Sequence, residues 1–186
     1  LALTRVAGVC PQHRDGSTPP VDTDMRDKLL QAMIKIDLTN LDPTSQLTYH
    51  RTLQIILSRF GRPDEAVVNQ LVAKIDPLFP SDTAEMNWLL CETLAWLEST
   101  SIAEKAIALI QSVPTQEEQM QYARSIRLLK AGWSDELKED YFEWFLKAAN
   151  YRGGASFAKF VEFIRDDAVA SLSEAQKESL AEILAR

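Results

Sequence analysis

The chain has 186 residues, of which 46% are hydrophobic and 25% are charged, a composition typical of a folded globular protein and not of a disordered one. Its formal net charge of −7 disfavours binding to nucleic acid and docking on anionic lipid, since both ligands are themselves negative. No apolar run is long enough to span a membrane. We therefore expect one domain over residues 1–186 that binds no nucleic acid and inserts into no membrane.

Two features of the chain bear on its context. Cys10 and Cys91 are too few to form a disulfide framework, so cysteine usage leaves the cellular compartment open. The chain begins with Leu1 and not with Met, and it carries no signal-peptide pattern. We expect it to be an excerpt from a longer protein.

Apolar residues recur at the spacing of an amphipathic helix along almost the whole chain, and no stretch alternates for long enough to predict a strand. The fold class is therefore all-α. A short helix is expected at 1–9. The longer helices are expected near 24–37, 43–60, 63–76, 82–98, 101–113, 115–131, 134–149, 155–171 and 173–185.

The first interruption is the segment 10–22, which holds three prolines and a glycine. It is too long for a tight hairpin, and loops of this kind are either functional or poorly ordered. We interpret it as poorly ordered, or as an insertion at the edge of the helical array.

Capping residues mark several of the later helix starts. Three pairs fit the capping box, in which a Ser or Thr and a Glu or Gln three residues later satisfy backbone N–H groups of the first turn; they begin at Ser101, Thr115 and Ser173. Asp82 begins an acidic variant of the same pattern. Pro43 and Pro63 suit a first helical turn, where no intrahelical N–H bond is lost.

The connections between these helices are short, which predicts that consecutive helices pack antiparallel. Hairpins then begin near residues 43, 82, 115 and 155, at steps of 33 to 40 residues. Helical-hairpin solenoids have repeats of about 34 to 47 residues. We predict antiparallel hairpins stacked as a HEAT-like α-α superhelix, with a non-repeating helical bundle as the alternative.

Residues that could carry catalysis or bind a metal are isolated from one another in the sequence. His13 and His50 are the only histidines, and neither lies near a plausible serine or cysteine nucleophile. Cys10 and His13 have the spacing of half a zinc site, but no second pair completes the four ligands. The aspartates at 22–27 lack the glycine and the last glutamate of a calcium-binding loop. We expect no catalytic residue, no cofactor and no metal.

A local basic stripe is the clearest candidate for a contact surface. Arg124, Arg127 and Lys130 follow one another at three-residue steps, and Arg152 follows the next helix. The stripe either contacts a partner or an anion, or it forms surface ion pairs. The carboxylates considered for such pairs are Glu117, Glu118, Glu136 and Glu139.

The tryptophans are more often core residues than parts of a ligand cage; they are Trp88, Trp96, Trp133 and Trp144. Trp133 is the candidate exception, because it follows Gly132 at a corner between helices, where an indole can stay partly exposed. An aromatic core is expected from the two helices that follow. Its members would be Tyr141, Trp144, Phe145, Phe157, Phe160 and Ile164.

The sequence NYRGGASF at 150–157 holds a single Arg-Gly-Gly between two apolar helices. RNA-binding Arg-Gly-Gly boxes are repeated, disordered and basic, so we interpret this one as a corner. It predicts a glycine at positive φ within Arg152–Ala155. As a secondary hypothesis, Gly154 and the following N–H groups hold an anion.

The segment 114–173 also resembles part of large multidomain proteins of planctomycete and verrucomicrobial type. The resembling elements include Pro114-Thr115, Gly132-Trp133, Tyr141-Phe142-x-Trp144-Phe145, Arg152-Gly153-Gly154-x-Ser156-Phe157 and Asp167-Ala168-Val169-Ala170. The resemblance extends over about residues 80–175, and the first half of the chain is only loosely similar. Those proteins are described as membrane-bound dehydrogenases or haem-binding proteins, and they join a β-propeller, a HEAT-like helical region and a c-type cytochrome domain.

The resemblance implies that this chain is the helical spacer before the haem-bearing domain, at the cell surface or in the periplasm. The haem attachment motif C-x-x-C-H is absent from the chain, so neither the haem nor the oxidation chemistry carries over. The expected function is a non-catalytic scaffold that positions redox domains. The alternative is a repeat module that binds a protein or ligand along its groove. Residues expected to contact a partner or anion are Arg124, Arg127, Lys130, Trp133, Arg152 and Gly154.

Overall fold

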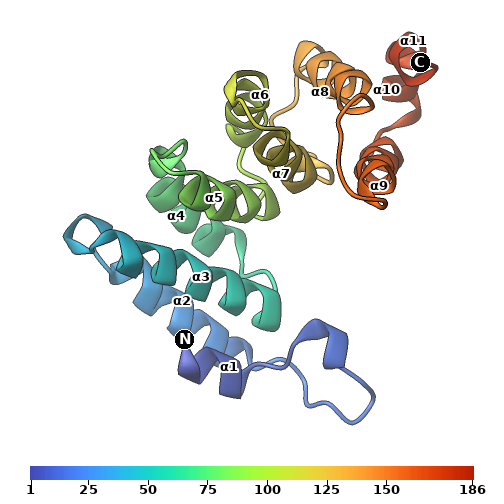
Figure 1. The fold of residues 1–186 in the computed structure, drawn as a ribbon. Coiled ribbons are helices and arrows are strands. Elements are labelled where there is room, and N and C mark those ends of the chain that lie inside the picture. Colours follow the sequence, from blue (N-terminus) through green and yellow to red (C-terminus); the bar gives the residue numbers. More distant parts are fainter. The chain divides into compact units, whose positions relative to one another are not determined.

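The computed structural model describes residues 1–186 and contains helices and no strand, so the prediction of an all-α fold is confirmed (Figure 1). The chain forms two compact units, Leu1–Leu78 and Phe79–Arg186. No helix is both long and apolar enough to cross a bilayer.

The helices of the first unit are α1 (Ala2–Ala7), α2 (Thr23–Lys35), α3 (Pro43–Phe60) and α4 (Glu65–Ile75). Three short 3-10 turns accompany them: η1 (Pro11–His13), η2 (Leu38–Asn40) and η3 (Asp76–Leu78). The helices of the second unit are α5 (Ala84–Trp96), α6 (Ile102–Ser112), α7 (Gln116–Ile126), α8 (Asp135–Ala148), α9 (Phe157–Ala170), α10 (Glu174–Ser179) and α11 (Ala181–Leu184). Most bounds lie within two residues of the predicted ones, but the helix predicted at 115–131 ends at Ile126 and the one at 173–185 is split in two.

Side-chain caps explain where several helices begin. Asp42 accepts from two backbone N–H groups of α3, whose first residue is Pro43 as predicted, and Ser173 forms the complete capping box of α10. At three helix starts, the residue that makes the cap differs from the prediction. Thr83 and not Asp82 caps α5, Ser101 makes no cap hydrogen bond, and Asp64 caps α4 one residue after Pro63.

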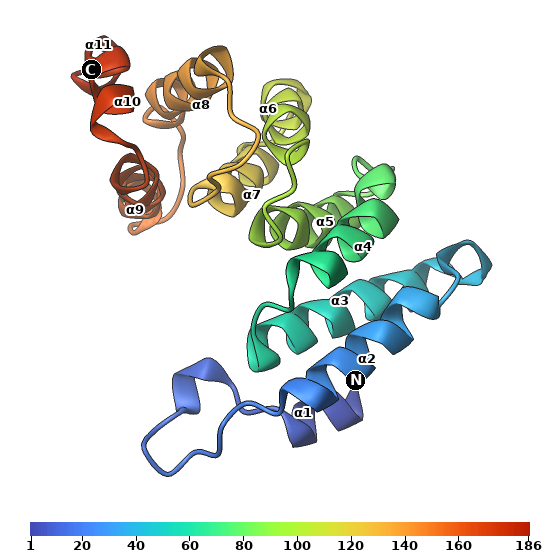
Figure 2. The ribbon, with the colours of Figure 1, turned by 180° about the vertical axis from the view of Figure 1, so that it is seen from behind.

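In the first unit, α2 lies against α3 and α4, and α1 lies against α3 (Figure 2). The Tyr49 hydroxyl ties α3 to α2 by donating to the Met33 carbonyl at 3.1 Å. The loop at 10–22 is attached to the end of α3, since Arg14 donates to the Arg59 carbonyl at 3.3 Å. Arg59 in turn donates to the Gly8 carbonyl at 2.6 Å. The Arg14 side chain thus attaches the loop to the end of α3, and the Arg59 side chain attaches α3 to the backbone just before the loop.

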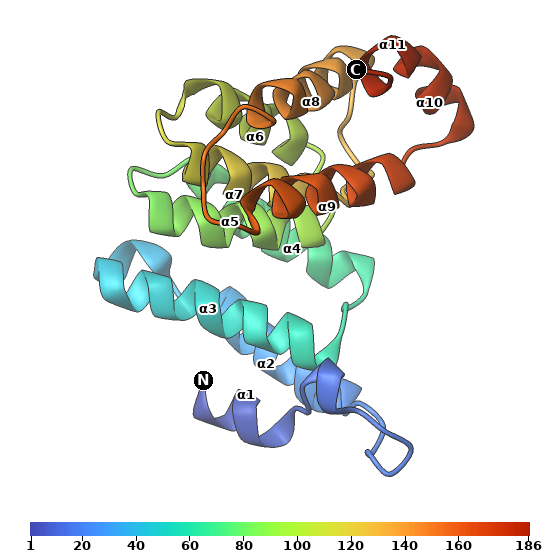
Figure 3. The same cartoon turned by 45° about the vertical axis from the view of Figure 1, so that its right-hand side comes forward.

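In the second unit, the longer helices alternate between two layers (Figure 3). The helices α5, α7 and α9 lie side by side in one layer, and α6 and α8 lie side by side in the other. Each helix thus packs against its neighbours in sequence and against the next helix but one. The core between the layers includes fully buried Leu90, Leu94, Ile110, Tyr122 and Ile126.

Two corners of the second unit, the connection between α5 and α6 and the connection between α7 and α8, are joined by hydrogen bonds. Glu98, between α5 and α6, has a φ of 58°, and its carboxylate accepts from the N–H groups of Lys130 and Ala131 at 3.0 Å each. Gly132, between α7 and α8, has a φ of 75°. A Cβ atom there would lie 2.1 Å from the Thr100 carbonyl oxygen. Glycine is therefore required at 132 both for its conformation and for the close approach of the two backbones.

The Arg-Gly-Gly segment connects α8 to α9, but the predicted positive φ within Arg152–Ala155 is wrong, because Gly61 and Gly132 are the glycines with positive φ. Gly153 is instead limited by space, since a Cβ atom there would lie 2.4 Å from the Phe157 ring. The connection is anchored by Gln116, which bonds both the N–H and the carbonyl of Arg152.

The aromatic core is confirmed in part. Tyr141, Trp144, Phe145 and Ile164 are buried, whereas Phe160 is 40% exposed. The expectation that tryptophans belong to the core is wrong for two of them. Helix α5 is apolar around most of its circumference, so periodicity does not specify which face is buried. The two exposed tryptophans are Trp88 and Trp96, at 40% and 43%.

Candidate functional site

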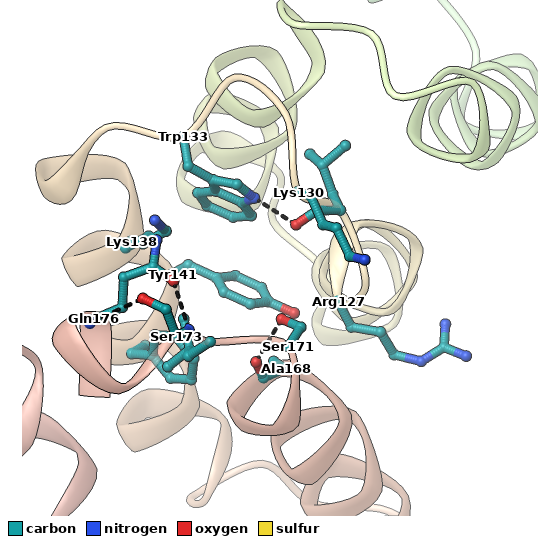
Figure 4. Close-up of a pocket in the computed structure, with 12 residues that line it drawn as sticks. Arg127, Lys130, Trp133, Lys138, Tyr141, Ala168, Ser171, Ser173 and Gln176 are labelled. Atoms are coloured by element: carbon teal, nitrogen blue, oxygen red, sulfur yellow. Dashed lines mark hydrogen bonds between the residues drawn. The ribbon is translucent and has the colours of Figure 1, made fainter.

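A cavity of about 150 Å³ lies where the end of α7, the first turns of α8 and the connection from α9 to α10 meet (Figure 4). Its aromatic walls are Trp133, Tyr141 and Phe142. Aliphatic side chains complete the apolar lining, and polar and basic side chains form the remainder. This is the place in the second unit where residues of the basic stripe and a partly exposed tryptophan come together.

The two largest rings of the cavity are held in place by hydrogen bonds at their polar ends. The Trp133 indole N–H donates to the Leu129 carbonyl at 2.8 Å, and the Tyr141 hydroxyl donates to the Ala123 carbonyl at 2.7 Å. Their ring centroids are 5.4 Å apart, tilted by 43°. Burial raises the pKa of Tyr141, so this phenol is a neutral structural group and does not serve as an acid or a base near neutral pH.

Three cations line the cavity, and they differ in what they contact. Arg127 pairs with Asp167 at 2.8 Å, and in Figure 4 its guanidinium extends away from the rings. Lys130 and Lys138 form no ion pair, and Figure 4 shows them on opposite sides of the two rings. No carboxylate side chain belongs to the lining. The two lysines therefore make this cavity locally positive on an acidic chain.

The remaining edge of the cavity is the polar turn between α9 and α10. Ser171 donates to the Ala168 carbonyl at 2.7 Å. Ser173 and Gln176 bond each other's backbone N–H groups through their side-chain oxygens, at 3.3 and 3.0 Å. This arrangement uses the acceptor oxygens and leaves the Ser173 hydroxyl hydrogen and the Gln176 amide hydrogens for another partner.

The structure brings together three of the six residues predicted to contact a partner or anion, namely Arg127, Lys130 and Trp133. The other three lie elsewhere. Arg124 pairs with Glu92 at 3.3 Å, while Arg152 and Gly154 are exposed in the connection between α8 and α9. The cavity therefore leaves out half of the residues predicted to contact a partner, and it excludes the Arg-Gly-Gly segment.

The predicted ion-pair partners of the basic stripe are wrong. Glu92 and Asp167, from helices α5 and α9, fill the role that was assigned to nearby glutamates at 117, 118, 136 and 139. Both observed partners are distant in sequence and reach the stripe only through helix packing. Lys138 was missed altogether, although its spacing of three and four residues from Tyr141 and Phe142 places it on the same side of α8 as these wall residues.

Cys91 and His50 occupy buried positions, whereas His13 is exposed. Burial raises the pKa of Cys91 to about 12 and lowers the pKa of His50 to about 4. His50 Nδ1 has no hydrogen-bond partner. No three His, Cys, Asp or Glu side chains lie close enough together to hold a metal ion.

Comparison of the chain with protein-family models, curated proteins and solved structures finds no match in any of the three. Its function is therefore inferred from the geometry of its own residues, together with the resemblance in the sequence described above.

Proposed function

We propose that the chain is a non-catalytic helical-repeat scaffold, a HEAT-like α-α superhelix that positions neighbouring domains of a larger protein. By the resemblance described above, those domains are a propeller and a c-type cytochrome, at the cell surface or in the periplasm. The partners of the chain are then domains of its own parent protein or of another protein. The chain itself holds no cofactor in this proposal.

The observation that carries the proposal is the alternation of helices between two layers in Phe79–Arg186. In this arrangement each hairpin packs mainly against the preceding and following hairpins, as in helical solenoids. The interlocked corners at Glu98 and Gly132 add a rigid joint between two successive hairpins. A scaffold needs such joints, because its contribution is to hold distances constant.

The state of the reactive side chains also supports a non-catalytic role. A nucleophilic cysteine needs an accessible thiolate, whereas Cys91 is fully buried and its pKa is raised to about 12. A general base needs contact with substrate, whereas His50 is 1% exposed. Neither residue offers chemistry to a ligand in solution.

The test uses the full-length protein. Residues 1–186 are replaced by a flexible Gly/Ser linker of equal reach, and the rate of electron delivery to the haem is measured. The scaffold role predicts a slower rate for the linker variant and an unchanged rate when an unrelated rigid helical array of equal length is inserted instead. A full rate with the flexible linker would contradict the proposal.

A second candidate function is recognition of a protein partner, and exposed apolar residues just after α7 and on α9 favour it. Leu128 is 54% exposed, Phe160 is 40% exposed and Phe163 is 55% exposed. Aromatic residues are enriched at protein interfaces. The double variant Phe160→Ser/Phe163→Ser should weaken capture of a separate partner domain in a pull-down, and it should leave the rate of electron delivery in the full-length protein unchanged.

A further inference from the structure

We infer that the cavity beside Trp133 binds a carboxylate attached to one small apolar body, such as a single aromatic ring. The scaffold role needs no such ligand, so this inference goes beyond it.

The size of the cavity limits the ligand. A volume of about 150 Å³ is smaller than the range for drug-sized ligands, roughly 300 to 1,000 Å³. An apolar cavity of about 150 Å³ takes up benzene. One ring, or an aliphatic group of similar size, therefore fits, and a nucleotide or a sugar chain does not.

The walls favour an apolar body. Trp133 and Tyr141 direct their polar atoms to the backbone carbonyls of Leu129 and Ala123. The ring surfaces that they present to a ligand are therefore apolar. Phe142 adds a third ring to the lining. Offset or tilted contacts between aromatic rings are favourable, and the Trp133–Tyr141 pair already has a tilted geometry.

The rim supplies hydrogen-bond donors without matching acceptors. Lys130 and Lys138 carry ammonium groups that form no ion pair, and Ser173 and Gln176 have unused donor hydrogens. An ionised carboxylate only accepts hydrogen bonds. The polar part of the ligand is therefore an acceptor, and the donors around it match a carboxylate.

The positive charge of the rim favours an acceptor group that is an anion. The chain holds 27 acidic and 20 basic side chains, yet the cavity is lined by three basic residues and no acidic one. Asp167 and Glu98 already have partners, because Asp167 pairs with Arg127 and Glu98 accepts from two backbone N–H groups. On either side of the rings, an anion at the rim therefore lies near a lysine that forms no ion pair.

Two kinds of ligand carry a carboxylate beside a small apolar group. A free organic acid of one ring presents a carboxylate and an apolar body. The C-terminal residue of a protein chain presents the same pair when its side chain is apolar. The experiment below separates them by comparing a small acid with a peptide.

The probe is benzoate, titrated into the full ¹⁵N-labelled chain while amide and indole resonances are recorded. We expect saturable shifts of the Trp133 indole N–H and of the backbone amides of Ser171, Ser173 and Gln176. For a ligand this small, a dissociation constant of about 1–10 mM is expected. Benzamide, which has the same shape and no charge, should bind at least about threefold more weakly.

Matched variants test the role of the lysines. Lys130→Gln and Lys138→Gln should each weaken benzoate binding about two- to fivefold and leave the unfolding midpoint unchanged. Lys147→Gln is the control, since Lys147 is an exposed lysine of α8 outside the cavity. It should leave binding unchanged.

The peptide arm uses a short peptide ending in phenylalanine, with either a free or an amidated C-terminus. Tighter binding of the free-acid peptide than of benzoate would identify a protein C-terminus as the source, and the reverse would identify a free organic acid. Equal binding of benzoate and benzamide would overturn the inference. So would the absence of saturable shifts with both benzoate and the peptide, or an undiminished affinity in both lysine variants.

Discussion

At the scale of single residues, a few positions are determined by contacts that no local pattern reveals. Gly132 must be glycine because its φ of 75° and its approach to the Thr100 carbonyl leave no room for a Cβ atom. Glu98 adopts a φ of 58° without being glycine, and its carboxylate compensates by binding two N–H groups of the facing corner. Strained conformations of this kind persist when the surrounding structure determines them.

Gly132→Ala should destabilise the second unit strongly. Positive φ costs an alanine about 1–2 kcal/mol, and a clash with a backbone carbonyl raises the total to about 3 kcal/mol. Urea denaturation followed by circular dichroism measures the change. Gly154→Ala is the control, since nothing lies within 4 Å of its Cβ position, and its effect should stay below about 0.5 kcal/mol. Equal effects for the two variants would contradict the close contact of the corners.

His50 should make the stability of the first unit depend on pH. Its pKa is lowered by burial to about 4 in the folded chain, so below pH 6.5 the unfolded chain binds a proton that the folded chain does not. The free energy of unfolding should therefore fall as the pH is lowered from about 6.5 to about 4, by at most about 3 kcal/mol.

Denaturant titrations at several pH values measure this dependence. His50→Leu should remove it within that window, whereas His13→Gln, in the loop at 10–22, should not. Carboxylates with lowered pKa values, such as Asp15 and Asp42, change the free energy of unfolding only near and below their ordinary pKa of about 4. A pH profile unchanged by His50→Leu would show that the histidine is not responsible.

At the scale of elements, α8 contributes most of the aromatic core of the second unit. Trp144 is 5% exposed, packs against Phe145 at a centroid distance of 4.9 Å and donates to the Gln119 side chain at 3.1 Å. The hydroxyl of Tyr151 also donates to Gln119, so this buried amide joins α7 to α8 and to the connection that follows.

Trp144→Ala should cost about 3–5 kcal/mol, because it leaves a large void beside Phe145. Trp144→Phe should cost less, since it keeps most of the packing and loses the hydrogen bond to Gln119. The control is Trp88→Ala in α5, whose side chain is 40% exposed and whose loss should cost about 1 kcal/mol or less. An unchanged unfolding midpoint for Trp144→Ala would show that the indole faces solvent.

In the connection between α8 and α9, Gly153 has no room for a side chain, whereas Gly154 faces open space. Gly153→Ala should destabilise the chain by about 1–2 kcal/mol, because the new Cβ atom would displace the Phe157 ring. The adjacent variant Gly154→Ala introduces the same methyl group into open space. Thermal denaturation should therefore show a lower midpoint for the first variant alone, and equal midpoints would exclude a steric role for Gly153.

At the scale of the whole molecule, the chain divides into two compact units at residues 78 and 79. Each has its own buried residues, such as Leu53 in the first unit and Leu94 in the second. Regions with separate cores open in separate cooperative steps.

Hydrogen exchange should report the two units independently. Trp144→Ala should reduce the protection of amides in α8 and leave that of α3 unchanged, because substitutions far apart without shared partners act independently. Leu53→Ala should have the opposite effect. A parallel loss of protection in both helices after either substitution would show that the chain unfolds as one cooperative unit.

Sequence by itself determined the helical fold and most helix bounds. Periodicity of apolar residues and local capping side chains act over a few residues, so their effects can be predicted without knowing the packing. Helix α3 begins at Pro43 and ends at Phe60 as expected, and the capping box at Ser173 is present. Trp133 was correctly singled out as a partly exposed tryptophan at a corner.

The tertiary structure decided which residues meet across helices. Arg127 and Arg124 find their carboxylate partners on α9 and α5, and the cavity joins α7, α8 and the turn before α10. Such contacts depend on the rotation of each helix and on the course of each connection, and these follow from packing over the whole unit. A helix that is apolar all round, such as α5, leaves its buried face undefined until its neighbours are in place, which is why the exposure of Trp88 and Trp96 could not be predicted.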